Sequence, residues 1–230
     1  MQIAGSVALV TGANRGLGRE FAKALVERGA AKVYAAARKP ESVDLEGVVP
    51  IQLDITDPAS IAAAAEQAND VNFLVNNAGT GGTADLLTGD LDEIRLHMDT
   101  HFYGTLAVTR AFAPGLKGGA LLNVLSVVSW TIGQDLHAYS AAKTAQWALT
   151  NSLRVRLAEQ NTLVSGLHVG YMDTDMIAAF DVPKHRPADI ANIALDGVAA
   201  GQYEILADDI SRTVRGALSG PLENLYPTLV

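Results

Sequence analysis

The stretch TGANRGLG, residues 11–18, joins two segments of different periodicity near the start of the chain. Residues 7–10 before it are a short apolar run, which favours a strand buried on both faces. The apolar residues of 21–26 after it have helical spacing, and Gly29 is expected to end that helix. Glycines between a strand and a helix let the backbone approach a pyrophosphate, and the helix N-terminus offers free N–H groups. This order therefore predicts a phosphate-binding turn.

Strand and helix signals alternate along the rest of the chain. Apolar runs predict further strands at 33–37, 48–53, 71–75, 120–125, 163–169 and 203–206, and helices are predicted over 59–68, 90–112, 137–159 and 187–200. Such alternation indicates a parallel sheet that is covered by helices on both faces. We therefore expect a doubly wound, Rossmann-type α/β fold of about seven strands, with residues 1–230 in a single domain.

Composition excludes several classes of protein and site. The net charge of −8 disfavours binding to nucleic acid, which requires clustered Lys and Arg. The chain has no cysteine, so disulfides, thiolate metal sites and cysteine nucleophiles are excluded. No apolar run approaches the roughly 18 residues that span a bilayer, and the first ten residues do not look like a signal peptide. We expect a cytoplasmic protein without a membrane or nucleic-acid partner.

Tyr139 and Lys143 are four residues apart on the helix predicted from His137, so they share one face of it. A free tyrosine, with a pKa of about 10, is a poor base at neutral pH. A neighbouring ammonium favours the phenolate, so we expect Lys143 to lower the pKa of Tyr139. The pair is suited to general acid–base chemistry on a substrate oxygen.

Three motifs, taken together, make the chain resemble the short-chain dehydrogenase/reductase family in its compact single-domain branch. The family pattern T-G-x-x-x-G-x-G matches residues 11–18, N-N-A-G matches residues 76–79, and Y-x-x-x-K matches Tyr139 and Lys143. The motifs occur in the family's order, and the resemblance covers residues 7 to about 206. It implies a nicotinamide-dependent oxidoreductase that reduces a ketone or aldehyde reversibly, with Tyr139 as general acid and base.

The resemblance also implies which residues contact the cofactor. Asp54 and the N–H of Ile55 are expected beside the adenine, while Met172 and Thr174 are expected beside the carboxamide. The full set of expected contacts is Gly12, Asn14, Arg15, Gly16, Leu17, Gly18, Arg38, Asp54, Ile55, Asn77, Ala78, Gly79, Tyr139, Lys143, Gly170, Met172 and Thr174.

The choice between the two nicotinamide cofactors can be argued from charge. A carboxylate about 20 residues beyond the glycine turn would bind a ribose 2′-hydroxyl and repel a 2′-phosphate. Residues 37–39 are instead Ala-Arg-Lys, and Arg15 lies within the turn itself. A pair of arginines can bind a phosphate through charge-assisted hydrogen bonds. We therefore expect NADP(H), the alternative being that Arg38 and Lys39 are ordinary solvated charges.

Two further residues complete the predicted catalytic group. Ser126 precedes Tyr139 by thirteen residues, which is the family spacing, so it is expected to hydrogen-bond the substrate oxygen, with Ser129 as its rival. His101 stands where the family usually has an asparagine, and it either sustains a proton relay or is only a tolerated helix residue. His97 and His101 have the spacing of a metal pair, but they lack a third ligand, so no metal site is expected.

The region after the sixth strand is expected to close the substrate pocket. Val169 stands where the family usually has a proline before Gly170, which removes one restraint on that turn. Residues 175–187 should form a mobile lid with apolar residues Met176, Ile177, Phe180 and Val182. Candidate pocket walls are Trp130, Ile132, Leu136, Tyr171 and Met176.

The resemblance implies a small carbonyl or alcohol substrate and a homodimer or homotetramer. The helices over 90–112 and 137–159 would form the interface, unless the alanines of the second helix only pack onto the sheet. A 3-oxoacyl reductase is the alternative enzyme, and a non-catalytic NADPH-binding regulator is the alternative of another class. Intact Ser126, Tyr139 and Lys143 favour an enzyme.

Overall fold

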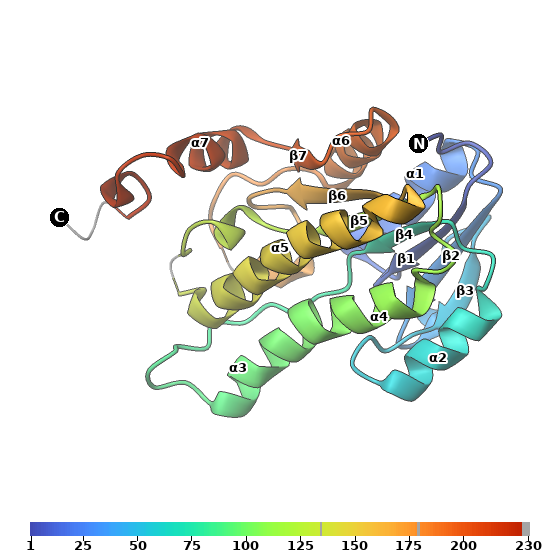
Figure 1. Ribbon diagram of the computed structural model, residues 1–230. Helices are drawn as coiled ribbons and strands as arrows, with labels where there is room; N and C mark the ends of the chain where they lie inside the picture. The colour runs from blue at the N-terminus through green and yellow to red at the C-terminus, as the bar shows by residue number, and fades with distance from the viewer. Residues whose placement is uncertain (134, 179, 227–230) are drawn as a thin grey trace.

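The structure is a computed structural model that describes residues 1–133, 135–178 and 180–226. Strands and helices alternate along it, as the sequence predicts (Figure 1). The strands are β1 (Val7–Thr11), β2 (Lys32–Ala37), β3 (Val49–Gln52), β4 (Phe73–Asn76), β5 (Ala120–Val124), β6 (Leu163–His168) and β7 (Glu204–Leu206). The helices are α1 (Gly16–Glu27), α2 (Pro58–Gln67), α3 (Leu91–Met98), α4 (Thr105–Phe112), α5 (His137–Leu157), α6 (Pro187–Ala199) and α7 (Asp209–Ala217).

The strands form one parallel sheet in the order β3-β2-β1-β4-β5-β6-β7. The chain builds outward from β1 to one edge and then from β4 to the other, so β1 and β4 flank the switch point. The loops that leave these two strands diverge, which opens a crevice at their carboxyl ends. The predicted doubly wound, Rossmann-type fold is confirmed.

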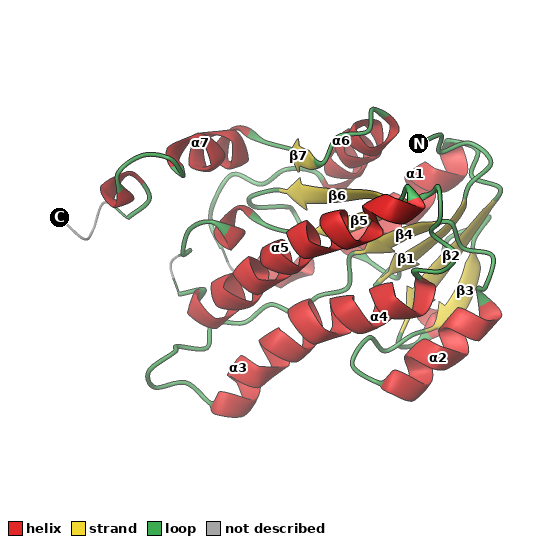
Figure 2. Cartoon of the chain, in the orientation of Figure 1, coloured by secondary structure: helices red, strands yellow, loops and turns green. Residues whose placement is uncertain are grey.

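Helices cover both faces of the sheet and give the protein two apolar cores (Figure 2). One core packs α1 and α6 against the sheet, with Phe21 and Ile190 buried. The other packs α2, α4 and α5, with Phe112 and Leu149 buried. Successive side chains of a strand point to opposite faces of the sheet, and each face of this sheet borders an apolar core. The side chains on both faces of the central strands must therefore be apolar. This explains why the central strands appear as continuous apolar runs in the sequence.

Two elements differ from the expectation. The helical segment predicted over 90–112 contains a π-helical turn, η2 (Asp99–Gly104), between α3 and α4. Such a turn inserts one extra residue, which apolar spacing alone does not reveal, and it is frequent at functional sites. Helix α7 was not predicted, because it is short and has only two large apolar side chains, Ile210 and Val214.

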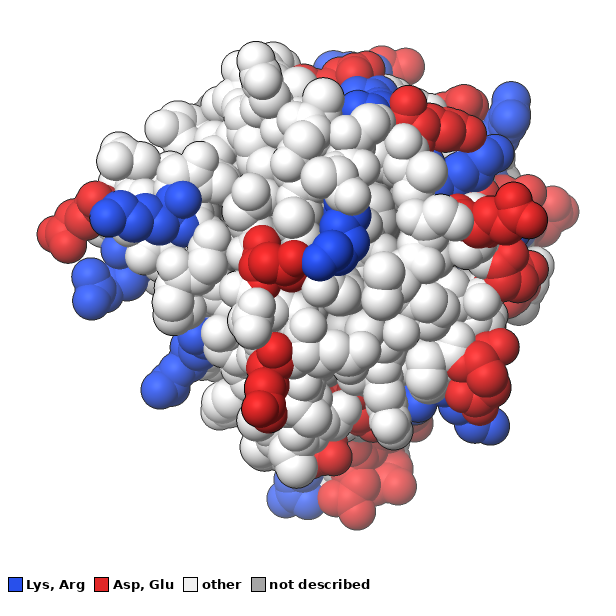
Figure 3. Space-filling model, turned by 90° about the vertical axis from the view of Figure 1, so that its right-hand side faces the viewer, with Lys and Arg blue, Asp and Glu red and all other residues white. Residues whose placement is uncertain are grey.

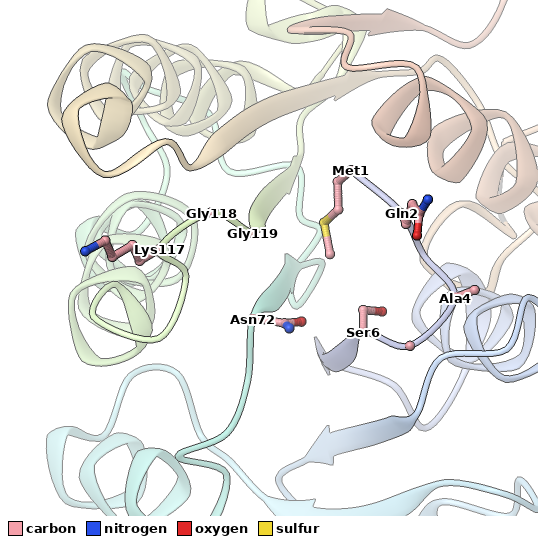
Figure 4. A pocket seen from close by; sticks show the side chains of 9 residues that line it. Met1, Gln2, Ala4, Ser6, Asn72, Lys117, Gly118 and Gly119 are labelled. Carbon is pink, nitrogen blue, oxygen red and sulfur yellow. The ribbon is translucent and has the colours of Figure 1, made fainter.

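Neither the amino ends of the strands nor the surface near them carries the motifs. Figure 3 shows the face on the right of Figure 1, which is largely uncharged: an acidic and a basic side chain lie side by side near its middle, and most other charged side chains lie toward the rim. A hollow of about 270 Å³ lies beside the starts of β1, β4 and β5, between the first residues of the chain and Gly118–Gly119 (Figure 4). Within the described ranges, no helix is both long and apolar enough to cross a membrane.

Candidate active site

The turn between β1 and α1 has the backbone that its glycines predict. Gly12 and Gly16 have φ of 65° and 54°, in the left-handed region that glycine tolerates. A Cβ on Gly18 would overlap the Gly12 carbonyl oxygen and lie 2.5 Å from Asn77 Nδ2. In the part of the chain that is described, no side chain caps the first turn of α1 and no acidic residue lies in it. Its free N–H groups and the helix dipole therefore suit the phosphates of a dinucleotide.

The motif at 76–79 braces the two central strands beneath that turn. Thr11 Oγ1 accepts hydrogen bonds from the N–H groups of Asn77 (3.0 Å) and Ala78 (2.9 Å). Asn77 Nδ2 donates to the Thr11 carbonyl oxygen at 2.9 Å. Ala78 lies directly against Gly12, where a Cβ would come within 3.0 Å of the Ala78 Cα. Asn77 therefore uses its side chain to hold β1 and β4 together, a role that the sequence analysis missed.

Positive charge beside the crevice comes from Arg15 and Arg38. Arg38 is exposed directly after β2, and Arg15 Nη1 lies 2.9 Å from Asp175 Oδ2, with both side chains of this ion pair largely exposed. Asp54 Oδ1 accepts hydrogen bonds from the Thr56 hydroxyl (2.7 Å) and N–H (2.9 Å). These bonds, together with the charge of Arg38, hold the pKa of the Asp54 carboxyl below its usual range. Asp54 is therefore ionised at neutral pH.

Three other predicted cofactor residues lie in or near the same crevice. The side chains of Leu17 and Ile55 are buried, Leu17 in the core beneath α1 and Ile55 against Gly104. Only the backbone of these two residues can therefore meet a ligand. Asn14 is half-buried in the glycine turn.

The segment after β6 approaches the glycine turn from the other side. Thr174 Cγ2 would lie 3.4 Å from a Cβ placed on Gly16, so Thr174 borders the turn. The N–H of Gly170 donates to Asp208 Oδ2 at 2.6 Å, so this amide is already paired within the protein. Met172 is half-buried between these two positions.

Ser126, Tyr139 and Lys143 meet beyond the carboxyl end of β5. Tyr139 and Lys143 lie in the first two turns of α5, with Lys143 Nζ 5.7 Å from the centre of the Tyr139 ring. The Ser126 hydroxyl lies close enough to Tyr139 to lower its pKa, and it also lies 3.4 Å from the Val169 carbonyl oxygen. The structure thus brings together the three residues that the spacing of the motifs predicts to be catalytic.

The rival serine has a different position. The turn η3 (Val127–Ser129) is closed by a capping box, in which Ser126 Oγ accepts from the Val128 N–H and Ser129 Oγ accepts from the Ser126 N–H, each at 3.3 Å. Ser129 is 1% exposed. Its hydroxyl therefore supports Ser126 from within the protein.

Burial dominates the titration of the Tyr139–Lys143 pair. It raises the pKa of Tyr139 to about 12, an effect that the hydrogen bond from Ser126 opposes, and it lowers the pKa of Lys143 to about 7. The expected lowering of the tyrosine pKa is wrong for the protein by itself, because surroundings of low polarity disfavour both charged forms. At neutral pH Tyr139 is therefore a phenol with a proton to donate.

Lys143 is held by groups that the sequence analysis did not select. Its Nζ donates to the Val124 carbonyl oxygen and to Gln146 Oε1, both at 2.9 Å. Gln146 Nε2 in turn donates to Thr105 Oγ1 at 3.0 Å. Gln146 is 1% exposed, and a buried glutamine needs hydrogen-bond partners. A glutamine on the inner face of α5, three residues after Lys143, was therefore the feature of the sequence that could have revealed this contact.

A second buried network links β4 and β5 to the helices above them. Asn76 Nδ2 donates to Asn123 Oδ1 (2.9 Å) and to Thr109 Oγ1 (3.0 Å). Asn123 Nδ2 donates to Thr150 Oγ1 at 2.9 Å. The first asparagine of the N-N-A-G motif therefore orders the strands and helices that carry the site.

His101 lies in η2 and is 1% exposed. Its Nε2 lies 2.9 Å from the Thr80 carbonyl oxygen, which can only accept, so Nε2 carries the hydrogen and Nδ1 is the acceptor. Nδ1 is buried and has no partner among the described residues. The His101 ring is 5.2 Å from the Tyr139 ring, and burial, with the charge of Lys143, holds the His101 pKa well below its usual range. A neutral imidazole with one free acceptor therefore borders Tyr139.

One expected pocket wall is wrong. Trp130 is 6% exposed, and its ring stacks on His168 with 3.6 Å between the centres. The reason is the turn η3, which directs the chain inward after Ser126. The remaining candidates are exposed or half-buried: Ile132, Leu136, Tyr171 and Met176.

Known proteins share both the motifs and the fold. Residues 6–183 match the family model described as short chain dehydrogenase. The short-chain dehydrogenase ptmH of Penicillium ochrochloron is 34% identical over 208 residues, which cover 85% of this chain and 75% of that protein. The 3-oxoacyl-[acyl-carrier-protein] reductase FabG of Vibrio harveyi is 31% identical over 205 residues, which cover 84% of each.

A solved structure of a short chain dehydrogenase from Burkholderia cenocepacia J2315, in complex with NADP, is similar over the whole chain. Its TM-score is 0.95 at 36% identity, with 100% of this chain and 99% of that chain covered. The match to the family model includes the glycine turn, the N-N-A-G motif and the Y-x-x-x-K pair. This chain belongs to the short-chain dehydrogenase/reductase family of oxidoreductases.

Proposed function

We propose that this protein is an NADP(H)-dependent oxidoreductase that reduces a ketone or aldehyde to an alcohol, reversibly. The observation that carries the proposal is the cluster of Ser126, Tyr139 and Lys143 beside the crevice of the glycine turn. With its pKa raised to about 12, Tyr139 holds its proton at neutral pH, as a proton donor to a carbonyl oxygen must.

When bound, the reduced nicotinamide supplies a hydride to the carbonyl carbon. Tyr139 donates its phenol proton to the carbonyl oxygen, and the Ser126 hydroxyl hydrogen-bonds the same oxygen. Lys143, with its pKa near 7, carries a positive charge part of the time and stabilises the phenolate that forms. His101 accepts a hydrogen bond at Nδ1 on the route that returns a proton to Tyr139, while Thr80 holds its other nitrogen in place.

The preference for NADP(H) rests on charge. Arg15 and Arg38 border the crevice, and residues 37–39 contain no carboxylate. The similar structure from B. cenocepacia contains NADP. Arg15 has to leave Asp175 to meet a 2′-phosphate, and an exposed ion pair of this kind contributes little to stability. The uncapped turn at α1, Asp54 and the segment 172–174 complete the cofactor site.

The substrate enters between residues 127–137 and a lid at 175–187. The lid begins with the short turn η5 (Asp175–Ile177) and ends where α6 starts, while residues 134 and 179 lie outside the described part of the chain. Ile132 and Met176 are 45% and 48% exposed at this opening. Their apolar surfaces favour a small, largely apolar carbonyl compound.

We also propose a homodimer or homotetramer formed through α5 and the helical segment that comprises α3, η2 and α4. The η2 turn carries the exposed apolar residue Tyr103 and α5 carries Val155, at 57% and 79% exposure. The segment from α3 to α4 runs beside α5 (Figure 1). Equilibrium sedimentation of the wild type and of Val155→Glu tests this interface, and a wild-type monomer at all concentrations contradicts it.

NADPH oxidation with a simple aryl ketone tests the chemistry. Tyr139→Phe keeps the ring and removes the proton, so we expect turnover to fall about 10²- to 10⁴-fold while NADPH still binds. Equal turnover of wild type and variant contradicts the mechanism. Arg38→Ala should weaken NADPH binding and leave NADH binding unchanged, because only NADPH has the 2′-phosphate.

A 3-oxoacyl thioester is the second substrate to test, because the chain is 31% identical to a 3-oxoacyl reductase. A strong preference for the thioester supports that alternative. NADPH binding without turnover of either substrate, in wild type, supports the non-catalytic regulator.

A further inference from the structure

His168, at the end of β6, is a buried titratable residue that contacts the backbone of the catalytic serine. It is 0% exposed, and its Nδ1 lies 3.2 Å from the Ser126 carbonyl oxygen. Because a carbonyl oxygen only accepts, Nδ1 carries the proton and donates this hydrogen bond. No motif includes His168, and the mechanism above does not use it.

The chain leaves the sheet at Ser126, and there the Ser126 carbonyl oxygen also accepts the Ser129 N–H at 3.0 Å, which closes the turn η3. β5 ends at Val124, although Leu125 and Val127 still donate their N–H groups to the backbone that ends β6, at 2.8 and 3.0 Å. The N–H of Ser126 is taken by Ser129 Oγ. A carbonyl oxygen has two lone pairs, so it can accept both hydrogen bonds, and His168 adds a side-chain restraint to the bond that the turn supplies.

Aromatic packing holds the imidazole in this orientation. The Trp130 ring stacks on His168 at 3.6 Å with an angle of 13° between the planes, and the Trp147 ring meets Trp130 edge-on at 6.2 Å. Arg215 of α7 lies over the Trp130 ring, 5.8 Å from its centre. Trp130, which covers the His168 ring, is therefore itself held by side chains of α5 and α7, and these helices lie around the end of β6 (Figure 1). Burial lowers the pKa of His168 to about 3, so it stays neutral.

We propose that His168 is a positioning residue, which holds the Ser126 carbonyl and so fixes the peptide from which the Ser126 hydroxyl reaches Tyr139. The inference rests on the proposed function, in which Ser126 hydrogen-bonds the substrate oxygen. Without the bond from His168, the Ser126 carbonyl oxygen is restrained only by the Ser129 N–H, so the Ser126 hydroxyl is less firmly placed toward Tyr139. A misplacement of about 1 Å at a reacting centre can lower the rate by about 10²-fold.

Three substitutions at this position separate a hydrogen bond from mere packing. The asparagine side chain of His168→Asn places an amide N–H close to the position of the histidine Nδ1. The glutamine side chain of His168→Gln places its amide N–H near the position of Nε2 instead, and His168→Leu has no donor. Ser165→Ala is the matched control, because it also removes a buried donor to a backbone carbonyl (Gln202, 2.7 Å) from the same strand.

We expect kcat for ketone reduction to fall roughly 10- to 100-fold in His168→Leu and His168→Gln, with NADPH affinity unchanged. His168→Asn should stay within about threefold of wild type, as should Ser165→Ala. If His168→Asn is no more active than His168→Gln, or if Ser165→Ala loses as much as His168→Leu, the proposal is overturned.

Crystal structures of the variants give a readout that does not depend on turnover. The separation between Ser126 Oγ and Tyr139 Oη should be that of wild type in His168→Asn and longer in His168→Leu. An unchanged separation in His168→Leu overturns the positioning role. If the wild type reduces no carbonyl compound, the proposed function fails, while this separation still decides the role of His168.

Discussion

Gln146→Met removes the side-chain acceptor of the buried Lys143 ammonium and keeps the side-chain volume. Two hydrogen bonds are lost, from Lys143 Nζ to Gln146 Oε1 (2.9 Å) and from Gln146 Nε2 to Thr105 Oγ1 (3.0 Å). A hydrogen bond to a charged group contributes about 1.5–3 kcal/mol and a neutral one about 0.5–1.5 kcal/mol. Lys143 keeps the Val124 carbonyl and, with a pKa of about 7, is charged only part of the time at neutral pH. We therefore expect the free energy of unfolding to fall by about 2–3 kcal/mol.

Thermal unfolding measures this effect. In a chain of this length, 1 kcal/mol changes the Tm by about 2–4 °C, so Gln146→Met should unfold about 4–12 °C below wild type. Gln146→Glu is the matched variant, since a carboxylate beside the ammonium raises the pKa of Lys143, which NMR titration of the lysine can follow. A Gln146→Met Tm within about 1 °C of wild type refutes the reasoning.

Gly18→Ala should abolish NADPH binding in calorimetry and lower the Tm, because its Cβ would overlap the Gly12 carbonyl oxygen. The control is Gly216→Ala, where a Cβ meets nothing within 4 Å, and it should change neither NADPH binding nor the fold. Ketone reduction needs the phenol of Tyr139, and alcohol oxidation needs its phenolate. A Tyr139 pKa of about 12 therefore predicts that kcat/KM for reduction is independent of pH across the neutral range, whereas kcat/KM for oxidation rises about tenfold per pH unit. An oxidation rate independent of pH would contradict this. His168 has a folded pKa of about 3 against 6.5 unfolded, so the unfolded chain binds more protons between these values, and stability should fall by about 1.4 kcal/mol per unit as pH falls through that window. Denaturant unfolding of His168→Asn should show a shallower dependence, and an equal slope in both proteins counts against a neutral His168.

Much of the site could be predicted because its motifs are local. Residues 11–18 carry the conformations of their own turn, and Tyr139 and Lys143 share a face through helical periodicity alone. The spacing of Ser126 from Tyr139 follows from the family pattern. Each of these predictions depends on residues close together in the chain, where backbone geometry relates sequence directly to position.

The supporting residues could not be predicted in this way. Gln146 accepts a hydrogen bond from Lys143 directly, but its side chain is held by Thr105, which lies 41 residues away. Trp130 was expected in the pocket, yet it packs inward on His168, which lies 38 residues later at the end of β6. Nor does a periodic pattern reveal the extra residue of the π-helical turn that carries His101.

By itself, the sequence determined the doubly wound fold and the glycine turn, and it selected the serine, tyrosine and lysine that we propose as catalytic, because these depend on local periodicity, turn geometry and spacing. Only the tertiary structure decided the protonation of Tyr139 and Lys143 and the partners of Ser126. Those properties depend on burial and on side chains that β5, β6, α5 and α7 bring to one place. The cost of burying a charge, or of leaving a carbonyl unpaired, arises only once the chain has folded around it.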